Sequence, residues 1–249
     1  MKNWEPDTET TYTNIDKTES INLVIPRMIG YNKRVYDSPL VDEDKPVYTL
    51  GIWCSGGADS TALLYLLAKT LQEKQSYMKI QPMSVRRQRP WNPVKATHVI
   101  NKITEILDFK NMLPHIIYYP DKKDEHQTEI KEFWDRDKEN QETGVWDVLY
   151  DGITSNPPKG EMPYDTDQKD RRNPDEDHEL ITPCGTYMRP FFNTNKKFVA
   201  DIYKQENLMS NLFPLTWSCE GTFEKTNGYL TPCESCWWCF ERYWAFDRY

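Results

Sequence analysis

The sequence predicts an α/β protein with a doubly wound parallel sheet and a separate cysteine-rich tail. From Val47 onward, short apolar runs alternate with segments of helical spacing, which is the pattern of βαβ units with right-handed crossovers. Four of the six cysteines fall between Cys219 and Cys239. A length of 249 residues suffices for one large domain with appendages.

Four strands and four helices follow from the alternation of these patterns, within a sheet of about five parallel strands. The predicted strands are "VYTLGIWCS" (47–55), "YMKIQPMSV" (77–85), "LPHIIYYP" (113–120) and "VWDVLYDGIT" (145–154). The predicted helices are 60–74, 92–109, 129–143 and 193–208.

Composition divides the chain into three parts. Residues 1–45 are polar and acidic with one strand-like segment, "INLVIPRMIGY", and we expect an extension that is partly ordered at best. Residues 46–215 form the main domain, in which the stretch 157–186, rich in proline and charge, is a loop insertion. Residues 216–249 form the tail.

Charge and hydropathy restrict the environment and the partners. The net charge of −8 argues against wrapping nucleic acid by bulk electrostatics, so nucleic acid is not the expected direct substrate. No apolar run approaches ~20 residues, and the first residues lack the apolar core of a signal peptide. We therefore expect a soluble, cytoplasmic protein whose cysteines are thiols or metal ligands.

A glycine-rich loop, "SGGADST", separates the first predicted strand of the main domain from its helix. Such a loop points backbone N–H groups outward at the positive end of a helix and can bind an anion. The alternative is a tight turn with a serine N-cap. The loop fits neither a Walker A motif nor a dinucleotide fingerprint. The candidate ligand-binding residues are Ser55, Gly56, Gly57, Ala58, Asp59, Ser60 and Thr61.

This loop resembles the SGGxDS signature of the PP-loop ATP pyrophosphatases, with Ala58 at the free position. The resemblance implies a sheet of the adenine nucleotide alpha-hydrolase type and ATP cleaved between its α and β phosphates. The loop would bind pyrophosphate. Because the Asp59 carboxylate repels phosphates, Mg²⁺ is expected between them.

The tail cysteines stand in the pattern C-x13-C-x2-C-x2-C. Four thiolates at short spacings suit a tetrahedral zinc site with Zn–S bonds near ~2.3 Å. An iron–sulfur cluster is the competing interpretation, and unligated thiols are a third. The candidate ligands are Cys219, Cys233, Cys236 and Cys239.

The sequence around the cysteines resembles the end of the 7-cyano-7-deazaguanine synthases. That family has a T-x-S-C segment, a C-x2-C-x2-C zinc knuckle, an arginine, and a proline followed six residues later by a lysine. The resemblance covers Val47 to about Phe246 and is weak between residues 110 and 186. The matching positions outside the knuckle are Pro190, Lys196, Thr216, Ser218, Cys219 and Arg242.

The resemblance implies an ATP-dependent ligase that acts on a 7-deazaguanine carboxylate. Adenylylation lets ammonia form an amide, and a second adenylylation yields a nitrile. Asp59 would orient Mg²⁺, and Lys196 would stabilise developing charge. ATP, Mg²⁺ and Zn²⁺ are the expected cofactors, and a homodimer is compatible with the family.

Two further groups are candidates for substrate contact. Arg86 and Arg87 follow a predicted strand at the carboxyl edge of the sheet, where they could bind an acidic group or form a solvated basic loop. Gly152, Thr154 and Asn156 follow another strand and could line the pocket.

Two other classes of function stay open. A PP-loop tRNA-thiolating enzyme would need a sulfur-carrying thiol, for which Cys184 is the candidate. A non-catalytic nucleotide-binding descendant would keep the fold and bind ATP without turnover.

Overall fold

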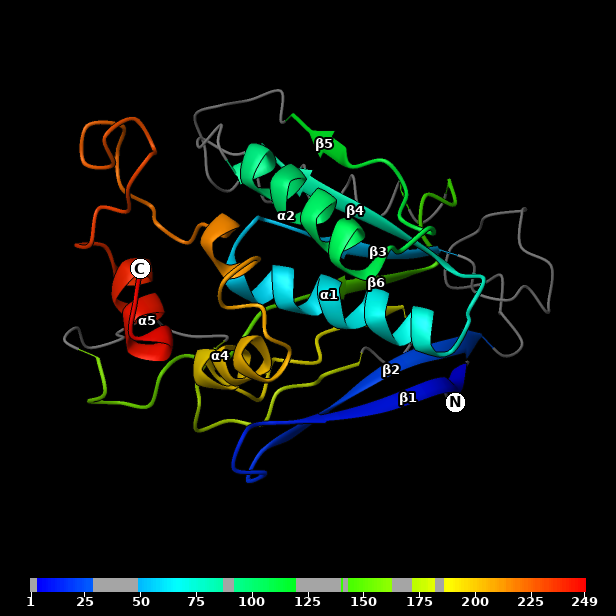
Figure 1. Ribbon diagram of the computed structural model, residues 1–249. Coiled ribbons are helices and arrows are strands. Elements are labelled where there is room, and N and C mark those ends of the chain that lie inside the picture. Colours follow the sequence, from blue (N-terminus) through cyan, green and yellow to red (C-terminus); the bar gives the residue numbers. More distant parts are fainter. Residues whose placement is uncertain are drawn as a thin grey trace.

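A five-stranded parallel sheet is the centre of the computed structural model, which describes residues 4–28, 49–86, 92–119, 140, 143–162, 172–181 and 186–249 (Figure 1). In spatial order the strands are β5 (Ile116–Tyr118), β4 (Lys79–Val85), β3 (Thr49–Trp53), β6 (Val148–Asp151) and β7 (Tyr187–Met188). All four neighbouring pairs are parallel. The predicted α/β class with a parallel sheet is thereby confirmed.

The strand order fixes where a ligand site can lie. The first strand of the sheet, β3, is central, and the chain builds outward through β4 and β5 before returning to β6 on the other side. This is the order of a doubly wound sheet, whose switch point lies between β3 and β6. The carboxyl ends of these two strands are therefore the expected edge for ligand binding.

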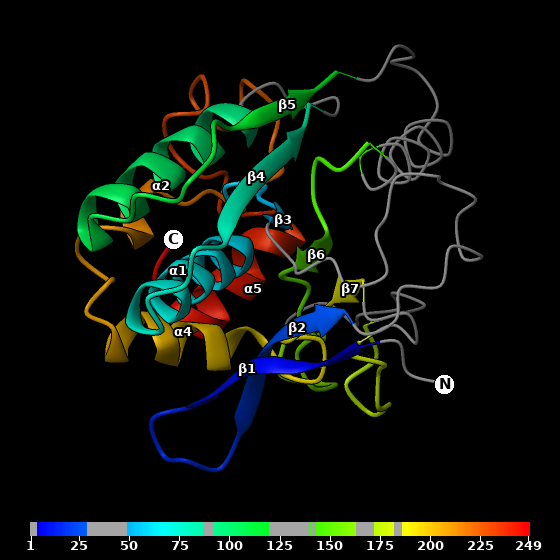
Figure 2. The same ribbon diagram turned by 90° about the vertical axis from the view of Figure 1, so that its right-hand side faces the viewer.

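Helices α1 (Ala58–Glu73), α2 (Asn92–Leu107) and α4 (Lys196–Gln205) lie on the same face of the sheet (Figure 2). α1 is apolar on nearly all sides because it packs between the sheet, α2 and α4. Leu50 and Ile52 of β3 point into this core and are fully buried. The opposite face carries a smaller cluster around Trp53, Met83 and Trp146.

The predicted elements differ from the observed ones mainly at their ends. β5 and β6 are shorter than the apolar runs that predicted them. The fifth strand, β7, is only two residues long and comes after the proline-rich stretch, where no periodic pattern marks it. Most of the predicted helix 129–143 lies outside the described residues.

Within the predicted extension 1–45, the described residues 4–28 form a β-hairpin and are not merely a loose extension. β1 (Trp4–Thr13) and β2 (Ser20–Met28) pair antiparallel, and Leu23 and Ile25 enter the main core. The Tyr150 hydroxyl on β6 donates to the Val24 carbonyl at 2.7 Å. β1 was missed because threonines and Tyr12 occupy its inward positions, so its alternation is concealed among polar residues.

The chain ends with a 3-10 turn, η1 (Phe213–Leu215), and helix α5 (Trp237–Phe246), which packs on α4. Among the described residues, no helix combines the length and the apolar character needed to cross a membrane.

Candidate functional site

The glycine loop lies between the end of β3 and the start of α1, at the switch point. Gly56 has a φ of +78°, and a Cβ there would stand 2.7 Å from the Ala96 nitrogen of α2. Only glycine meets both conditions. The Ser55 and Gly57 N–H groups donate to the hydroxyls of Ser60 and Ser55, at 3.2 and 3.3 Å. Side-chain hydroxyls thus hold the loop around the first turn of α1.

Two segments that are distant in the sequence hold the loop by hydrogen bonds to its backbone carbonyls. The Trp217 N–H donates to the Gly56 carbonyl at 2.8 Å, and the Tyr203 hydroxyl donates to the Ala58 carbonyl at 3.1 Å. Trp217 belongs to the T-x-S-C segment, so the tail and the loop are bonded directly. The conformation of the loop therefore depends on α4 and on the tail as well as on the sheet.

Gly152 has a packing role in this arrangement. A Cβ at Gly152 would lie 2.8 Å from the Ser60 Cα and 2.9 Å from its nitrogen. The chain after β6 can therefore pass against the first turn of α1 only because position 152 is glycine. The predicted substrate contact at Gly152 stays untested, and the observed contact is with backbone.

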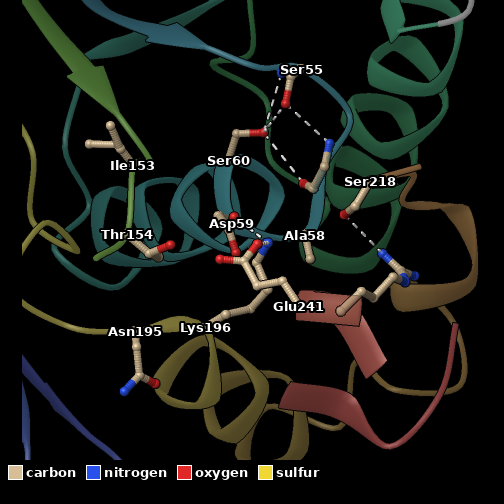
Figure 3. A network of polar contacts seen from close by, with 12 residues as sticks. Ser55, Ala58, Asp59, Ser60, Ile153, Thr154, Asn195, Lys196, Ser218 and Glu241 are labelled. Carbon is tan, nitrogen blue, oxygen red and sulfur yellow. Dashed lines mark hydrogen bonds and ion pairs between the residues drawn. The ribbon is translucent and has the colours of Figure 1, made fainter. Parts of the chain in front are cut away.

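A chain of charged side chains runs beneath the loop (Figure 3). The Lys196 Nζ, from the first residue of α4, lies 3.1 Å from Asp59 Oδ2 and also pairs with Glu241 of α5. The other oxygen of Glu241 accepts from Arg172 at 2.8 Å. Asp59, Lys196, Glu241 and Arg172 thus join the loop, α4, the tail and the insertion 157–186.

Burial makes these pairs interdependent. Lys196 is 1% exposed and Glu241 is fully buried, whereas the Asp59 side chain is 23% exposed. Burial alone would lower the pKa of Lys196, but the carboxylates of Asp59 and Glu241 outweigh it and raise that pKa. Burial raises the pKa of Asp59, and the attraction of Lys196 opposes the rise. The Lys196 ammonium is therefore held in its charged form.

Arg172 organises the chain after β6. Its Nε donates to the Thr154 carbonyl at 2.7 Å, and its own carbonyl accepts from the Asn156 N–H at 2.8 Å. The guanidinium lies 5.5 Å from the ring centroids of both Trp237 and Trp238. Thr154 and Asn156, both predicted as substrate contacts, are thus buried beside the ion chain.

Three buried oxygen atoms of the site have no hydrogen-bond partner within the described part of the chain: Asp59 Oδ1, Thr61 Oγ1 and Asn156 Oδ1. A buried polar atom without a partner costs free energy, so all three atoms suit a ligand that brings a hydrogen-bonding group or a cation. An anionic oxygen such as that of Asp59 is a preferred ligand of Mg²⁺.

The four tail cysteines converge on one point. Their Sγ atoms all lie within 4.8 Å of one another, and those of Cys233 and Cys239 are 4.0 Å apart. Zn–S bonds of ~2.3 Å in a tetrahedron place the sulfurs about 3.8 Å apart. In a four-iron cluster each thiolate binds its own iron, which spreads the sulfurs further. The spacing therefore fits one tetrahedral ion better than a cluster.

Backbone groups around the cysteines also suit thiolates. The N–H groups of Gly221 and Cys233 both donate to the Cys219 Sγ at 3.2 Å. A hydrogen bond from the Cys239 thiol lowers the pKa of Cys236 to about 5. A Cβ at Gly221 would stand 2.6 Å from the Cys233 Cβ, so the turn that closes the cluster needs glycine.

Arg242 connects the cysteine helix to the T-x-S-C segment. It donates to Thr216 Oγ1 at 2.8 Å and to the Phe213 carbonyl at 3.2 Å, and lies 3.9 Å from the Phe213 ring centroid. The segments that carry the resemblance are therefore also in contact in space.

The remaining candidates lie at the margin of the site or beyond the described residues. Arg86 is exposed at the end of β4, 5.6 Å from the Tyr119 ring centroid. Arg87 and Cys184 fall outside the described residues. Cys54, directly before the loop, is buried, and burial raises the pKa of its thiol to about 11.

Sequence reasoning missed Glu241 and Arg172. Glu241 and Arg242 are the only charged residues of α5, whose other members are mostly aromatic, so a lone carboxylate in "WWCFERYWAF" was an available signal. Arg172 offered none, because it lies among charges in an aperiodic stretch.

Comparisons with known proteins add little. No family model and no curated protein matches the chain. Among solved structures, the U34-tRNA thiolase NcsA from Methanococcus maripaludis, with its 4Fe-4S cluster, is similar over 75% of this chain at 14% identity and a TM-score of 0.42. This chain spans 66% of that one. A likeness of this size does not establish a shared activity, so function is inferred from the residues of this chain.

Proposed function

We propose that this protein is an ATP-dependent ligase of the PP-loop type that adenylylates a 7-deazaguanine carboxylate. The observation that supports it is the ion chain, in which Asp59 of the glycine loop, Lys196 of α4 and Glu241 of the cysteine tail meet at the carboxyl ends of β3 and β6. These are the three segments on which the resemblance to the 7-cyano-7-deazaguanine synthases rests.

The loop supplies the binding site for the polyphosphate. Backbone N–H groups at the start of α1 attract anions, and Ser55 can add a hydroxyl donor. Asp59 Oδ1 would hold Mg²⁺, which when bound neutralises phosphate charge. Lys196 keeps its ammonium beside Asp59, and one of its three N–H groups remains for a ligand.

The reaction proceeds by displacement at phosphorus and then at carbon. A carboxylate oxygen of the substrate attacks the α-phosphorus, and the bond to the β-phosphate oxygen breaks, releasing pyrophosphate. Ammonia then attacks the acyl carbon, loses a proton, and AMP leaves with the carboxylate oxygen to give the amide. The amide oxygen then attacks the α-phosphorus of a second ATP, releasing a second pyrophosphate, and loss of AMP together with the two remaining N–H protons gives the nitrile. AMP is a better leaving group than the oxygen of the free carboxylate. Ammonia is therefore a sufficient nucleophile at neutral pH.

The four cysteines would hold Zn²⁺ in a closed structural site. All four positions of a tetrahedral ion are filled by Cys219, Cys233, Cys236 and Cys239, so the site would hold the tail in place and leave no open position for chemistry. Trp217 and Glu241 depend on that order, because they join the tail to the loop and to Lys196.

tRNA thiolation is the alternative ATP-using function. It would need a reactive thiol, and the buried Cys54 with its raised pKa does not suit that role. The test of the thiolation alternative is the variant Cys184→Ser, which should leave amide formation unchanged and abolish thiolation.

The test is turnover of 7-carboxy-7-deazaguanine with Mg-ATP and ammonium, followed by mass spectrometry of zinc-replete protein. We expect AMP and pyrophosphate together with the amide or the nitrile. Asp59→Asn should lose turnover, whereas Asp108→Asn, at a side chain 80% exposed, should keep it. Bound ATP without AMP under these conditions would contradict the proposed substrate.

A further inference from the structure

We infer that Lys95 of α2 binds the β and γ phosphates of ATP, and the released pyrophosphate, at the glycine loop. This inference rests on the proposed function, in which the loop holds a polyphosphate. It assigns the counter-charge of that polyphosphate to a residue outside every motif of the sequence analysis.

The ion chain cannot supply that counter-charge. Asp59 and Glu241 carry two negative charges, and Lys196 and Arg172 carry two positive ones, so the chain is neutral. Pyrophosphate with its single Mg²⁺ still carries negative charge. A cation beside the loop that is not already balanced by a carboxylate would therefore stabilise the bound pyrophosphate further.

Arg242 is not such a cation. It is buried and donates to Thr216 and to the Phe213 carbonyl, with the Phe213 ring against its guanidinium. Moving it toward the loop would leave these buried acceptors without their donor.

Lys95 has the required position. Its Cβ stands 2.9 Å from where a Cβ of Gly56 would be, so its backbone touches the loop. Its Nζ lies 4.8 Å from the centroid of the Trp217 ring, and the Trp217 N–H in turn bonds the Gly56 carbonyl. The Lys95 side chain thus extends along the edge of the loop between α2 and the tail.

Lys95 is also available. Within the described parts of the chain no carboxylate pairs with it, and its ammonium is held only by the face of an aromatic ring. A cation–π contact is weaker than a charge-assisted hydrogen bond to phosphate. The ammonium can therefore exchange the ring for a phosphate oxygen when the loop is filled.

The test is calorimetric titration of the full, zinc-replete protein with magnesium pyrophosphate. Lys95→Met should weaken pyrophosphate binding about tenfold or more, and Lys95→Arg should retain most of it. Lys102→Met is the matched control, since it removes the same charge from the same helix about 10 Å further along. Lys102 pairs with Glu105 and should leave binding unchanged.

Each outcome separates this inference from the proposed function. Wild-type protein that binds neither pyrophosphate nor Mg-ATP would contradict the proposed function itself. Wild-type binding that Lys95→Met leaves intact, or that Lys102→Met weakens equally, would overturn the assignment of Lys95 alone. AMP has no β or γ phosphate, so its affinity should be the same in Lys95→Met and wild type, and a parallel loss would also overturn it.

Discussion

The glycine loop and the cysteine tail meet at one site, but different interactions hold them in place. The loop is continuous with β3 and α1, whose side chains belong to the large core of the sheet. The end of α5 joins this core through Ala245 and Phe246, whereas the segment around the cysteines forms a small cluster of its own, in which Trp217, Cys219 and Cys239 are buried. The loop therefore rests mainly on the core of the sheet, whereas the cysteine segment would rest mainly on the proposed metal ion.

This difference matters because the tail contributes to the loop. Trp217 bonds the Gly56 carbonyl, and Glu241 bonds Lys196. Binding of the proposed metal ion would therefore determine the geometry of the proposed ATP site while the sheet remains folded.

Loss of a metal ligand should have the largest effect. Structural zinc contributes on the order of 10 kcal/mol to the folding of small zinc domains at neutral pH. Cys239→Ser should lose the ion, disorder the tail and reduce AMP formation to background. Metal content, AMP formation and far-UV circular dichroism measured together would show a lost site on a folded sheet.

The matched control is Cys54→Ala, which removes a buried thiol outside the cluster. It should keep its full metal content. Cooperative unfolding of the whole sheet in Cys239→Ser would contradict the division between the two regions.

Glu241→Gln should break the link between the regions with the tail still metal-bound. It leaves the buried cations Lys196 and Arg172 without their shared carboxylate, for which removal of a buried partner costs about 3–5 kcal/mol. Denaturant titration should show this loss of stability, and Mg-ATP binding should weaken. Glu224→Gln, at an exposed site of the tail, should change neither stability nor Mg-ATP binding. If Glu241→Gln also left both unchanged, the ion chain would be unimportant.

Gly152→Ala tests the contact between the chain after β6 and the first turn of α1. The added methyl group would collide with the Ser60 backbone, and overpacking of this kind costs about 1–3 kcal/mol. We expect a lower unfolding midpoint and weaker Mg-ATP binding with unchanged metal content. Gly144→Ala should also lower the unfolding midpoint, because a φ of +73° strains alanine, but a Cβ there meets open space and Mg-ATP binding should be unchanged.

A fall in pH should destabilise the region beside the loop through His115. Its ring bonds Thr97 and Ser84, and Ser84 donates to the Cys54 carbonyl just before the loop. Burial lowers the pKa of His115 from 6.5 to about 4, so the unfolded chain binds the proton first. This contribution to stability is present above pH 6.5 and is lost as the pH falls toward 4.

The effect is the smallest of the four because the ring is partly solvated. Thermal midpoints at pH 7 and pH 5 should differ less in His115→Gln than in wild type. His98→Gln, at an exposed position of α2, should keep the wild-type difference, and equal changes in both variants would contradict the assignment.

The sequence was informative where local chemistry determines local structure. Helices α1, α2 and α4 follow from apolar periodicity, and the position of Gly56 at a positive φ follows from the glycine-rich loop. The convergence of the four cysteines follows from their spacing. In each case the residues involved are neighbours along the chain or lie in a recognisable pattern.

Contacts between distant segments could not be predicted in the same way. Glu241 pairs with Lys196, 45 residues away, and with Arg172, 69 residues away, so nothing local in the sequence indicates either pair. β1 was missed because its strand pattern consists of polar residues, and the packing role of Gly152 was missed because its need for glycine arises from a helix almost a hundred residues earlier. These contacts follow from topology, which places the ends of β3 and β6 together.

The glycine loop is proposed to bind ATP for cleavage between the α and β phosphates. The most direct test is exchange of labelled pyrophosphate into ATP, with 7-carboxy-7-deazaguanine present and ammonium omitted. We expect exchange that depends on the carboxylate and disappears in Asp59→Asn. Formation of ADP and phosphate without any exchange would place the cleavage elsewhere and contradict the claim.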